Sequence, residues 1–139
     1  MIKEDYYSFH LPEDLDWDLD PGDTIAFAEG PDLEPYEIAV QTNRLLTGDV
    51  GRSVDEDFRV ADESGRDTPL KRGENRAIDG VEGWTSETTS AYAGDPVINY
   101  SYGTAVDGYS FEIKFMISKD DPNAHDLIEA TLASLEWKR

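Results

Sequence analysis

Apolar and polar residues alternate along much of the first 43 residues, which is the pattern of β-strands that bury one face. Three runs have this period of two: Tyr7, Phe9 and Leu11; Ile25 and Phe27; Tyr36, Ile38 and Val40. Turn-forming residues lie between the runs. Pro21-Gly22 precedes the second run, and Gly30-Pro31-Asp32 precedes the third. The sequence therefore predicts three strands in this part of the chain.

The second half of the chain predicts a meander of three further strands. Their expected spans are Ala77 to Thr88, Pro96 to Thr104 and Tyr109 to Ser118. Breaks are expected at Ala93-Gly94-Asp95 and at Asp107-Gly108, and the second of these is a typical hairpin turn. The third strand has the clearest pattern, because Phe111, Ile113, Phe115 and Ile117 alternate with Ser110, Glu112, Lys114 and Met116.

Helical spacing occurs at two places. Ser53 is a predicted N-cap with Glu56 three residues later, and Val54, Phe58 and Ala61 follow at helical intervals. This pattern favours a short mid-chain helix, after which residues 63–75 are expected to form a mobile loop.

The second helix is expected near the C-terminus, over residues 122–134. Asp121 is its predicted N-cap and Pro122 its first residue. Its apolar face contains Leu127, Ile128, Thr131, Leu132 and Leu135. Such a face is expected to lie on the sheet, and Leu135 with Trp137 is expected to end the chain as a short edge strand.

The order of these elements predicts an α+β fold in a single domain spanning residues 1–139. We expect a twisted antiparallel sheet of six or seven strands, with the C-terminal helix packed across one face and a short mid-chain helix. A chain of 139 residues is long enough to bury a hydrophobic core without disulfides, and it contains no cysteine.

Charge narrows the classes of function. The chain has 31 acidic and 12 basic residues, a net charge of −19 at pH 7. This field repels phosphate backbones and anionic lipid, so neither nucleic acid nor membrane is an expected ligand. The acidity is explained by a halophilic or solubility-related surface, by a surface that attracts a basic protein partner, or by cation binding. No signal-peptide or membrane-spanning run is present, and we expect a soluble cytoplasmic protein.

The densest acidic stretch runs from Pro12 to Asp23 and holds six carboxylates in twelve residues. It is not an EF-hand loop, because neither possible register has the required glycine at position 6 or glutamate at position 12. Four aspartates alternate with Leu15, Trp17 and Leu19. A solvated face, a protein interface and a cation site all fit this pattern. The predicted partner-binding residues are Asp14, Asp16, Trp17, Asp18 and Asp20.

No catalytic motif is present. His10 and His125 are the only histidines, and a site containing both would have to be assembled by the fold. The chain has no H-E-x-x-H, G-x-S-x-G, P-loop or G-x-G-x-x-G motif. We therefore predict no enzyme activity, no cofactor and no metal site.

Aromatic residues cluster in the predicted meander. Tyr100 and Tyr102 share one strand face, and Trp84 lies on a neighbouring strand. Core packing or cross-strand pairing explains most of these residues. A second hypothesis is a tyrosine-lined pocket for an apolar ligand, formed by Trp84, Tyr100 and Tyr102.

Four segments resemble the PsbP-like superfamily, which includes the Ran-binding Mog proteins, the LpqN lipoprotein group and the Eag effector chaperones. These segments are YSFHLPEDLDW, IDGVEGW, GYSFEIKFMI and DLIEATLASLEWK. The middle of the chain departs from the resemblance, because a charged loop with one or two helical turns replaces the long central helix. The resemblance implies a protein that binds other proteins or apolar ligands and has no common active site.

The favoured hypothesis is a non-enzymatic acidic binding module. Its expected partner is a protein with a basic or apolar patch. A toxin or secreted effector would be such a partner, and the module would then be a cytoplasmic immunity protein or effector chaperone. The alternatives are the apolar-ligand-binding protein and an acidic protein of another role.

Overall fold

The computed structural model describes most of the chain. The residues that it describes are 2–3, 7–11, 17–19, 24–29, 35–44, 53–63, 69–92, 94–106 and 108–137. Its strands are β1 (Ile2–Lys3), β2 (Tyr7–Phe9), β3 (Asp18–Leu19), β4 (Thr24–Glu29), β5 (Pro35–Arg44), β6 (Arg76–Ile78), β7 (Val81–Tyr92), β8 (Asp95–Val106), β9 (Tyr109–Ser118) and β10 (Glu136–Trp137). Its helices are α1 (Val54–Asp62) and α2 (Ala124–Ala133).

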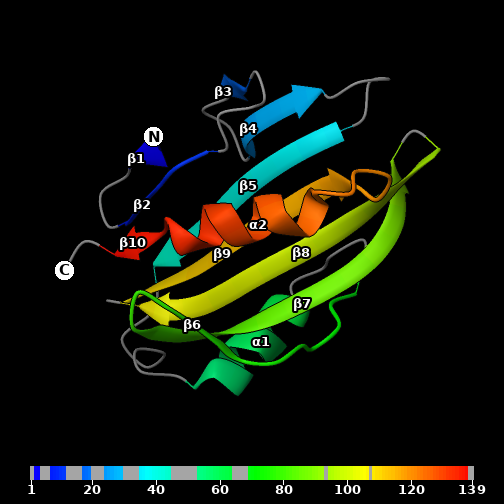
Figure 1. Cartoon of the computed structure of the whole chain (residues 1–139). Coiled ribbons are helices and arrows are strands. Elements are labelled where there is room, and N and C mark those ends of the chain that lie inside the picture. The colour runs from blue at the N-terminus through cyan, green and yellow to red at the C-terminus, as the bar shows by residue number, and fades with distance from the viewer. Residues whose placement is uncertain are drawn as a thin grey trace.

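Seven of these strands form one twisted antiparallel sheet in the order β3-β4-β5-β9-β8-β7-β6 (Figure 1). The central strand β9 pairs with β5 on one side, from Tyr109 to Ile117, and with β8 on the other over its full length. The α+β class and the number of strands are confirmed. Strand β2 was expected in this sheet, but it forms a second sheet with β1 and the C-terminal strand β10.

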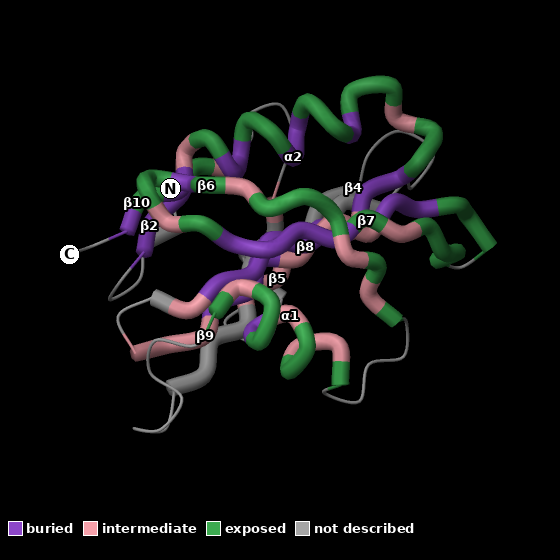
Figure 2. Tube along the Cα trace, turned by 90° about the horizontal axis from the view of Figure 1, so that it is seen from below, coloured by how far each residue is buried: buried purple, intermediate pink, exposed green. Residues whose placement is uncertain are grey.

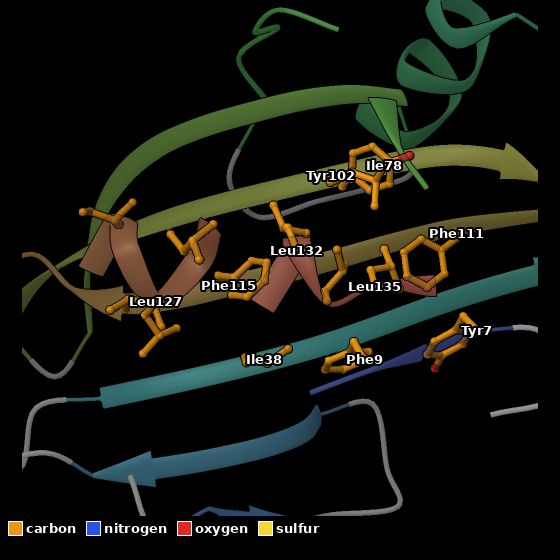
Figure 3. Packing of buried hydrophobic residues seen from close by; sticks show 14 of the residues in the cluster. Tyr7, Phe9, Ile38, Ile78, Tyr102, Phe111, Phe115, Leu127, Leu132 and Leu135 are labelled. Carbon is orange, nitrogen blue, oxygen red and sulfur yellow. The ribbon is translucent and has the colours of Figure 1, made fainter. Parts of the chain in front are cut away.

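Helix α2 lies across the sheet over β9 and β8, as predicted, and α1 lies on the opposite face (Figures 1 and 2). The alternation in β9 places Phe111, Ile113, Phe115 and Ile117 under α2, where each is almost completely buried. They meet the helix residues Leu127 and Leu132 (Figure 3). Because burying one such side chain is worth about 1.5–3 kcal/mol, this layer dominates the hydrophobic core.

The predicted strand Ala77 to Thr88 is two strands. Asp79 and Gly80 have positive φ angles of 46° and 81°, and they join β6 to β7 in a tight hairpin. An Asp-Gly pair is a strong signal for this turn, because both central residues of a type I′ turn need positive φ. The same signal at Asp107-Gly108 predicted a hairpin that is confirmed, whereas the turn at Asp79-Gly80 was not predicted.

The mid-chain helix is confirmed with its cap. The Ser53 hydroxyl accepts a hydrogen bond from the Glu56 N–H at 3.2 Å. Helix α2, however, begins at Ala124 and not at Pro122. The Asp121 carboxylate accepts a hydrogen bond from the Asn123 N–H at 2.8 Å, and the Asp121 carbonyl accepts one from the Ala124 N–H at 3.2 Å. Asp121 therefore closes a turn that precedes the helix.

Candidate binding groove

The face of the sheet opposite α2 contains a groove of about 310 Å³. Its floor consists of side chains that alternate with the core residues, so that Lys114 and Met116 of β9 lie beside Ser101 and Asn99 of β8. The complete lining is Glu37, Ala39, Pro69, Leu70, Ser86, Thr88, Asn99, Ser101, Lys114, Phe115 and Met116. Strands β5, β9, β8 and β7 thus form the floor, and Pro69 with Leu70 forms a wall.

This wall is held at both of its sides by hydrogen bonds. The Leu70 N–H donates to the Asp62 carboxylate at the end of α1, at 3.0 Å. On the sheet side, the Lys71 N–H donates to the Ser86 hydroxyl at 2.9 Å, and the Gly73 N–H donates to the Thr85 carbonyl at 2.7 Å. Residues 69–75, which the sequence analysis assigned to a loop, are therefore fastened along β7.

Helix α1 is itself fixed on the sheet by Trp84. The Trp84 indole Nε1–H donates to the Asp57 carboxylate at 2.9 Å, and both side chains are buried. The Phe58 ring packs edge-on against Trp84, with ring centroids 5.3 Å apart. A side chain at Gly103 would overlap the indole, because a Cβ atom there would lie 2.2 Å from it. Gly103 therefore makes room for Trp84 beneath α1.

Arg72 joins the wall to the outer side of α1. Its guanidinium carbon lies 5.3 Å from the centroid of the Phe58 ring, and its Nη2 lies 2.9 Å from the Asp55 carboxylate. Both ends of residues 69–72 thus contact the helix, so we expect the wall and α1 to move as one unit.

The groove is far less acidic than the chain as a whole. Of its lining residues, Glu37 and Lys114 carry charge. The Lys114 ammonium lies 4.0 Å from the carboxylate of Glu112, a neighbouring β9 residue that is only 7% exposed. The rest of the lining is apolar or carries hydroxyl and amide groups. The site can therefore contact an apolar side chain and offer it hydrogen bonds, without a concentrated charge.

The three aromatic residues predicted for a ligand pocket do not lie together. Trp84 pairs with Gly103 and lies on the α1 side of the sheet. Tyr100 and Tyr102 do share a face, as predicted, but it is the α2 side. Tyr102 is completely buried, and its hydroxyl donates to the Val81 carbonyl at 2.8 Å. This burial raises the pKa of the Tyr102 phenol well above its usual value.

Tyr100 and Arg76 belong to a contact between the sheet and the outer side of α2. The Arg76 guanidinium makes two hydrogen bonds to the Glu129 carboxylate, at 2.7 and 2.8 Å. These bonds lower the pKa of Glu129 and raise the pKa of Arg76, to which a hydrogen bond with Tyr100 also contributes. This is a structural use of a tyrosine that the sequence pattern assigned to a ligand.

Two of the five predicted partner-binding residues, Trp17 and Asp18, are described by the structure, and Asp18 lies at the other edge of the sheet. Asp14, Asp16 and Asp20 are outside the described residues. Asp18 is in the edge strand β3, which pairs with β4, and the half-buried Trp17 packs against the hydrophobic core. Their role as partner contacts stays a prediction.

The two histidines are at opposite ends of α2. The His10 N–H donates to the Ser134 hydroxyl at the C-terminal end, at 2.8 Å. His125 is in the first turn, and its Nε2 lies 2.9 Å from the Glu87 carboxylate. A helix of this length separates them by about 15 Å, so they do not form one site. In the part of the chain that the structure describes, no group of three potential ligands is arranged for a metal ion.

The groove itself was not predicted from the sequence, although one signal indicated the contact that fixes α1 on the same face of the sheet. Asp57 lies three residues after Val54 and directly before Phe58, on the apolar side of α1, where a carboxylate is unusual. Such a residue indicates a specific buried partner, here Trp84.

None of the described helices is long and apolar enough to cross a bilayer.

Comparison with known proteins gives a match in structure and none in sequence. No protein-family model matches the chain, and no curated protein matches it significantly. A structure from Bacteroides thetaiotaomicron VPI-5482 superposes with a TM-score of 0.62 and 15% identity, covering 96% of this chain and 45% of that one. The chain thus spans less than half of the Bacteroides protein.

Two smaller proteins share the fold over most of their length. LpqN, which is involved in cell envelope biogenesis of Mycobacterium tuberculosis, has a TM-score of 0.68 and 9% identity, with coverage of 96% of this chain and 83% of LpqN. Cyanobacterial PsbP (CyanoP) from Synechocystis sp. PCC 6803 has a TM-score of 0.57 and 16% identity, with coverage of 95% and 86%. The resemblance to the PsbP-like superfamily is confirmed at the level of the fold.

Proposed function

We propose that this protein is a non-enzymatic binding module that receives part of a protein partner in the groove between the wall at Pro69-Leu70 and the sheet. The observation that carries the proposal is the groove itself, a hollow of about 310 Å³ with an apolar wall and a mixed floor of apolar and polar side chains, of which Glu37 and Lys114 are charged. One apolar side chain of a partner, with its flanking backbone, fills a hollow of this kind.

The charge of the chain defines the expected partner. A net charge of −19 attracts a basic protein over a distance of several ångströms and accelerates association. Long-range attraction does not require the acidic residues to touch the groove, so Asp18 of β3 can contribute from the other edge of the sheet. A basic toxin or secreted effector would be such a partner, and the module would then act in the cytoplasm as an immunity protein or effector chaperone.

Selection from a peptide library displayed on phage tests this proposal. Peptides selected on the wild-type protein are re-assayed on Ala39→Trp, which fills the groove floor, and on Ala77→Trp, which makes the same change on exposed β6. We expect the selected peptides to be basic with an apolar residue, and to lose at least tenfold in affinity on Ala39→Trp but not on Ala77→Trp. Equal binding to both variants, or a selection without binders, contradicts the proposal.

A kinetic experiment tests the contribution of charge. Replacing Asp14, Asp16, Asp18 and Asp20 by asparagine should slow the association of a selected basic peptide and reduce its dependence on salt, because the electrostatic attraction is weaker. The dissociation rate should change little. Association that is unaffected by the four substitutions removes this stretch from the binding mechanism.

One observation favours a second candidate. A volume of about 310 Å³ is also at the lower end of the range for small-molecule pockets. An apolar small ligand would then occupy the groove, in place of the predicted tyrosine pocket. A thermal-shift screen on wild type and Ala39→Trp separates the candidates, because a small ligand stabilises the wild type without any peptide.

A further inference from the structure

The outer edge of β7 is partly covered by the chain itself. Strand β8 pairs with one side of β7 from Trp84 to Tyr92. On the other side, β6 covers residues 81–83, and a single bridge joins Arg72 to Ser86. Beyond Ser86, no described residue pairs with this side, and Figure 1 shows β7 as the margin of the sheet there. Among the residues that the structure describes, Thr88–Tyr92 is therefore a sheet edge.

The hydrogen bond from Gly73 shows which backbone groups point outward. The Thr85 carbonyl accepts from the Gly73 N–H at 2.7 Å, so Thr85 presents its backbone groups to the outer edge. Alternate residues of a strand point the same way, so Thr89 and Ala91 also present an N–H and a carbonyl there. Both residues are exposed. Two residues thus offer four hydrogen-bonding groups to an added strand.

Pro69 limits the backbone pairing that the residues after it make with this edge. Lys71 and Gly73 both donate their N–H groups towards β7, and Pro69 is the next residue with the same orientation. Proline has no N–H to donate, so Pro69 cannot add a third such hydrogen bond. The covered part of β7 nevertheless demonstrates that a segment can lie along this edge.

The edge lacks the usual protection against a further strand. Natural edge strands are often very short or carry lysine, proline or a β-bulge. Strand β3, at the opposite edge of the sheet, has two residues. Residues 88–92, by contrast, contain neither lysine nor proline, and their register with β8 is regular. This part of β7 is suited to pairing.

We propose that the β7 edge at Thr88–Tyr92 binds an extended basic segment of the protein partner as an additional strand. The inference rests on the proposed function and specifies its mode of binding. Thr88 lies on this edge and also lines the groove, so side chains of the added strand can reach over the groove. The main chain of the partner would supply affinity, and its side chains specificity.

Electrostatic complementarity favours a basic segment of a partner over a second copy of this chain at this edge. The exposed carboxylates of Glu87 and Asp95 flank it, and the net charge of the chain is −19. A second copy of the chain would bring the same negative charge to the interface, whereas a basic segment is complementary. Tyr92 is 45% exposed at the end of the edge, where its ring can pack against an arginine or lysine side chain.

Backbone NMR tests the proposal with a synthetic eight-residue peptide in which lysine and valine alternate. In the free protein we expect fast amide exchange at Thr89 and Ala91 and slow exchange at Ser90, whose N–H faces β8. The peptide should slow exchange at Thr89 and Ala91 at least tenfold. A peptide with glutamate in place of lysine should have no effect.

Three variants separate this edge from the groove. Thr89→Pro removes an outward N–H and should weaken binding of the lysine-valine peptide at least tenfold, whereas Thr89→Val keeps that N–H and should bind as wild type. Ala39→Trp should also retain binding, because its change is confined to the groove. Circular dichroism checks the fold of Thr89→Pro, and the exchange data on wild type remain decisive if that variant unfolds.

The outcomes distinguish the two proposals. Loss of binding on Ala39→Trp but not on Thr89→Pro overturns the edge proposal and leaves the groove as the binding site. Slow exchange at Thr89 and Ala91 before any peptide is added, with a dimer in sedimentation, assigns the edge to a second copy and also overturns it. Unchanged exchange with the basic peptide overturns it as well, while peptides selected from the phage library test the groove independently.

Discussion

The hydrogen bond between Trp84 and Asp57 is predicted to hold α1 on the sheet. The indole N–H and the carboxylate are 2.9 Å apart, and Trp84 and Asp57 are 0% and 4% exposed. Hydrogen bonds to a charged group contribute about 1.5–3 kcal/mol to stability, and burial of both groups favours the upper half of that range. We therefore expect a coupling energy of about 2–3 kcal/mol between the two side chains.

A double-mutant cycle measures this coupling. Trp84→Phe, Asp57→Ala and the double variant are unfolded in urea and followed by circular dichroism at pH 7. Each single substitution also loses packing, but that part cancels in the cycle. The variant Asp57→Asn should lose less than Asp57→Ala, because its amide oxygen can still accept the indole hydrogen.

Trp137 provides a matched control for the cycle. Its indole N–H also makes a buried hydrogen bond, to the Ile78 carbonyl at 2.9 Å, but on the other side of the sheet. Trp137→Phe combined with Asp57→Ala should therefore be additive within about 0.5 kcal/mol. A coupling below about 0.5 kcal/mol for Trp84 and Asp57 would refute the reasoning, and α1 would then be held by apolar packing alone.

Two further predictions concern Tyr102 and the β6–β7 turn. Burial raises the pKa of Tyr102, so above about pH 10 the unfolded chain loses a proton that the folded protein keeps, and stability falls as pH rises. Tyr102→Phe should cost about 1 kcal/mol at pH 7, from the lost bond to Val81, and should flatten this alkaline decline in urea unfolding. An unchanged alkaline slope would contradict the assignment. Gly80→Ala should destabilise by about 1–2 kcal/mol, because φ is +81° there. Asp79→Asn should be nearly neutral in thermal unfolding, since asparagine tolerates positive φ, and equal losses in both variants would argue against this turn geometry.

Patterns among residues that are neighbours in sequence were sufficient to predict much of the fold. The alternation in β9 and the Ser53 cap of α1 depend on residues that are neighbours in sequence, and both predictions are confirmed. The pairing of β2 with β10 joins residues more than 120 positions apart, and no local pattern contains it. The Asp79-Gly80 turn was available in the sequence and was overlooked.

The candidate site was harder to predict, because it depends on register and on tertiary contacts. The face on which Trp84 lies is decided by its pairing with Gly103, and that register follows from the length of the β7–β8 turn. The groove wall depends on the contact of Leu70 with Asp62 and of Lys71 with Ser86. Residue type alone indicates none of these partners.

The pairing of β2 with β10 also has a consequence for biosynthesis. Tyr7 and Ser8 pair with Trp137 and Glu136 of β10, which the ribosome adds more than 120 residues later. Until those residues emerge, Tyr7 and Ser8 lack the strand with which they pair. Strand β2 is thus synthesised long before the strand with which it pairs, which makes it a natural target for chaperones that shield nascent chains.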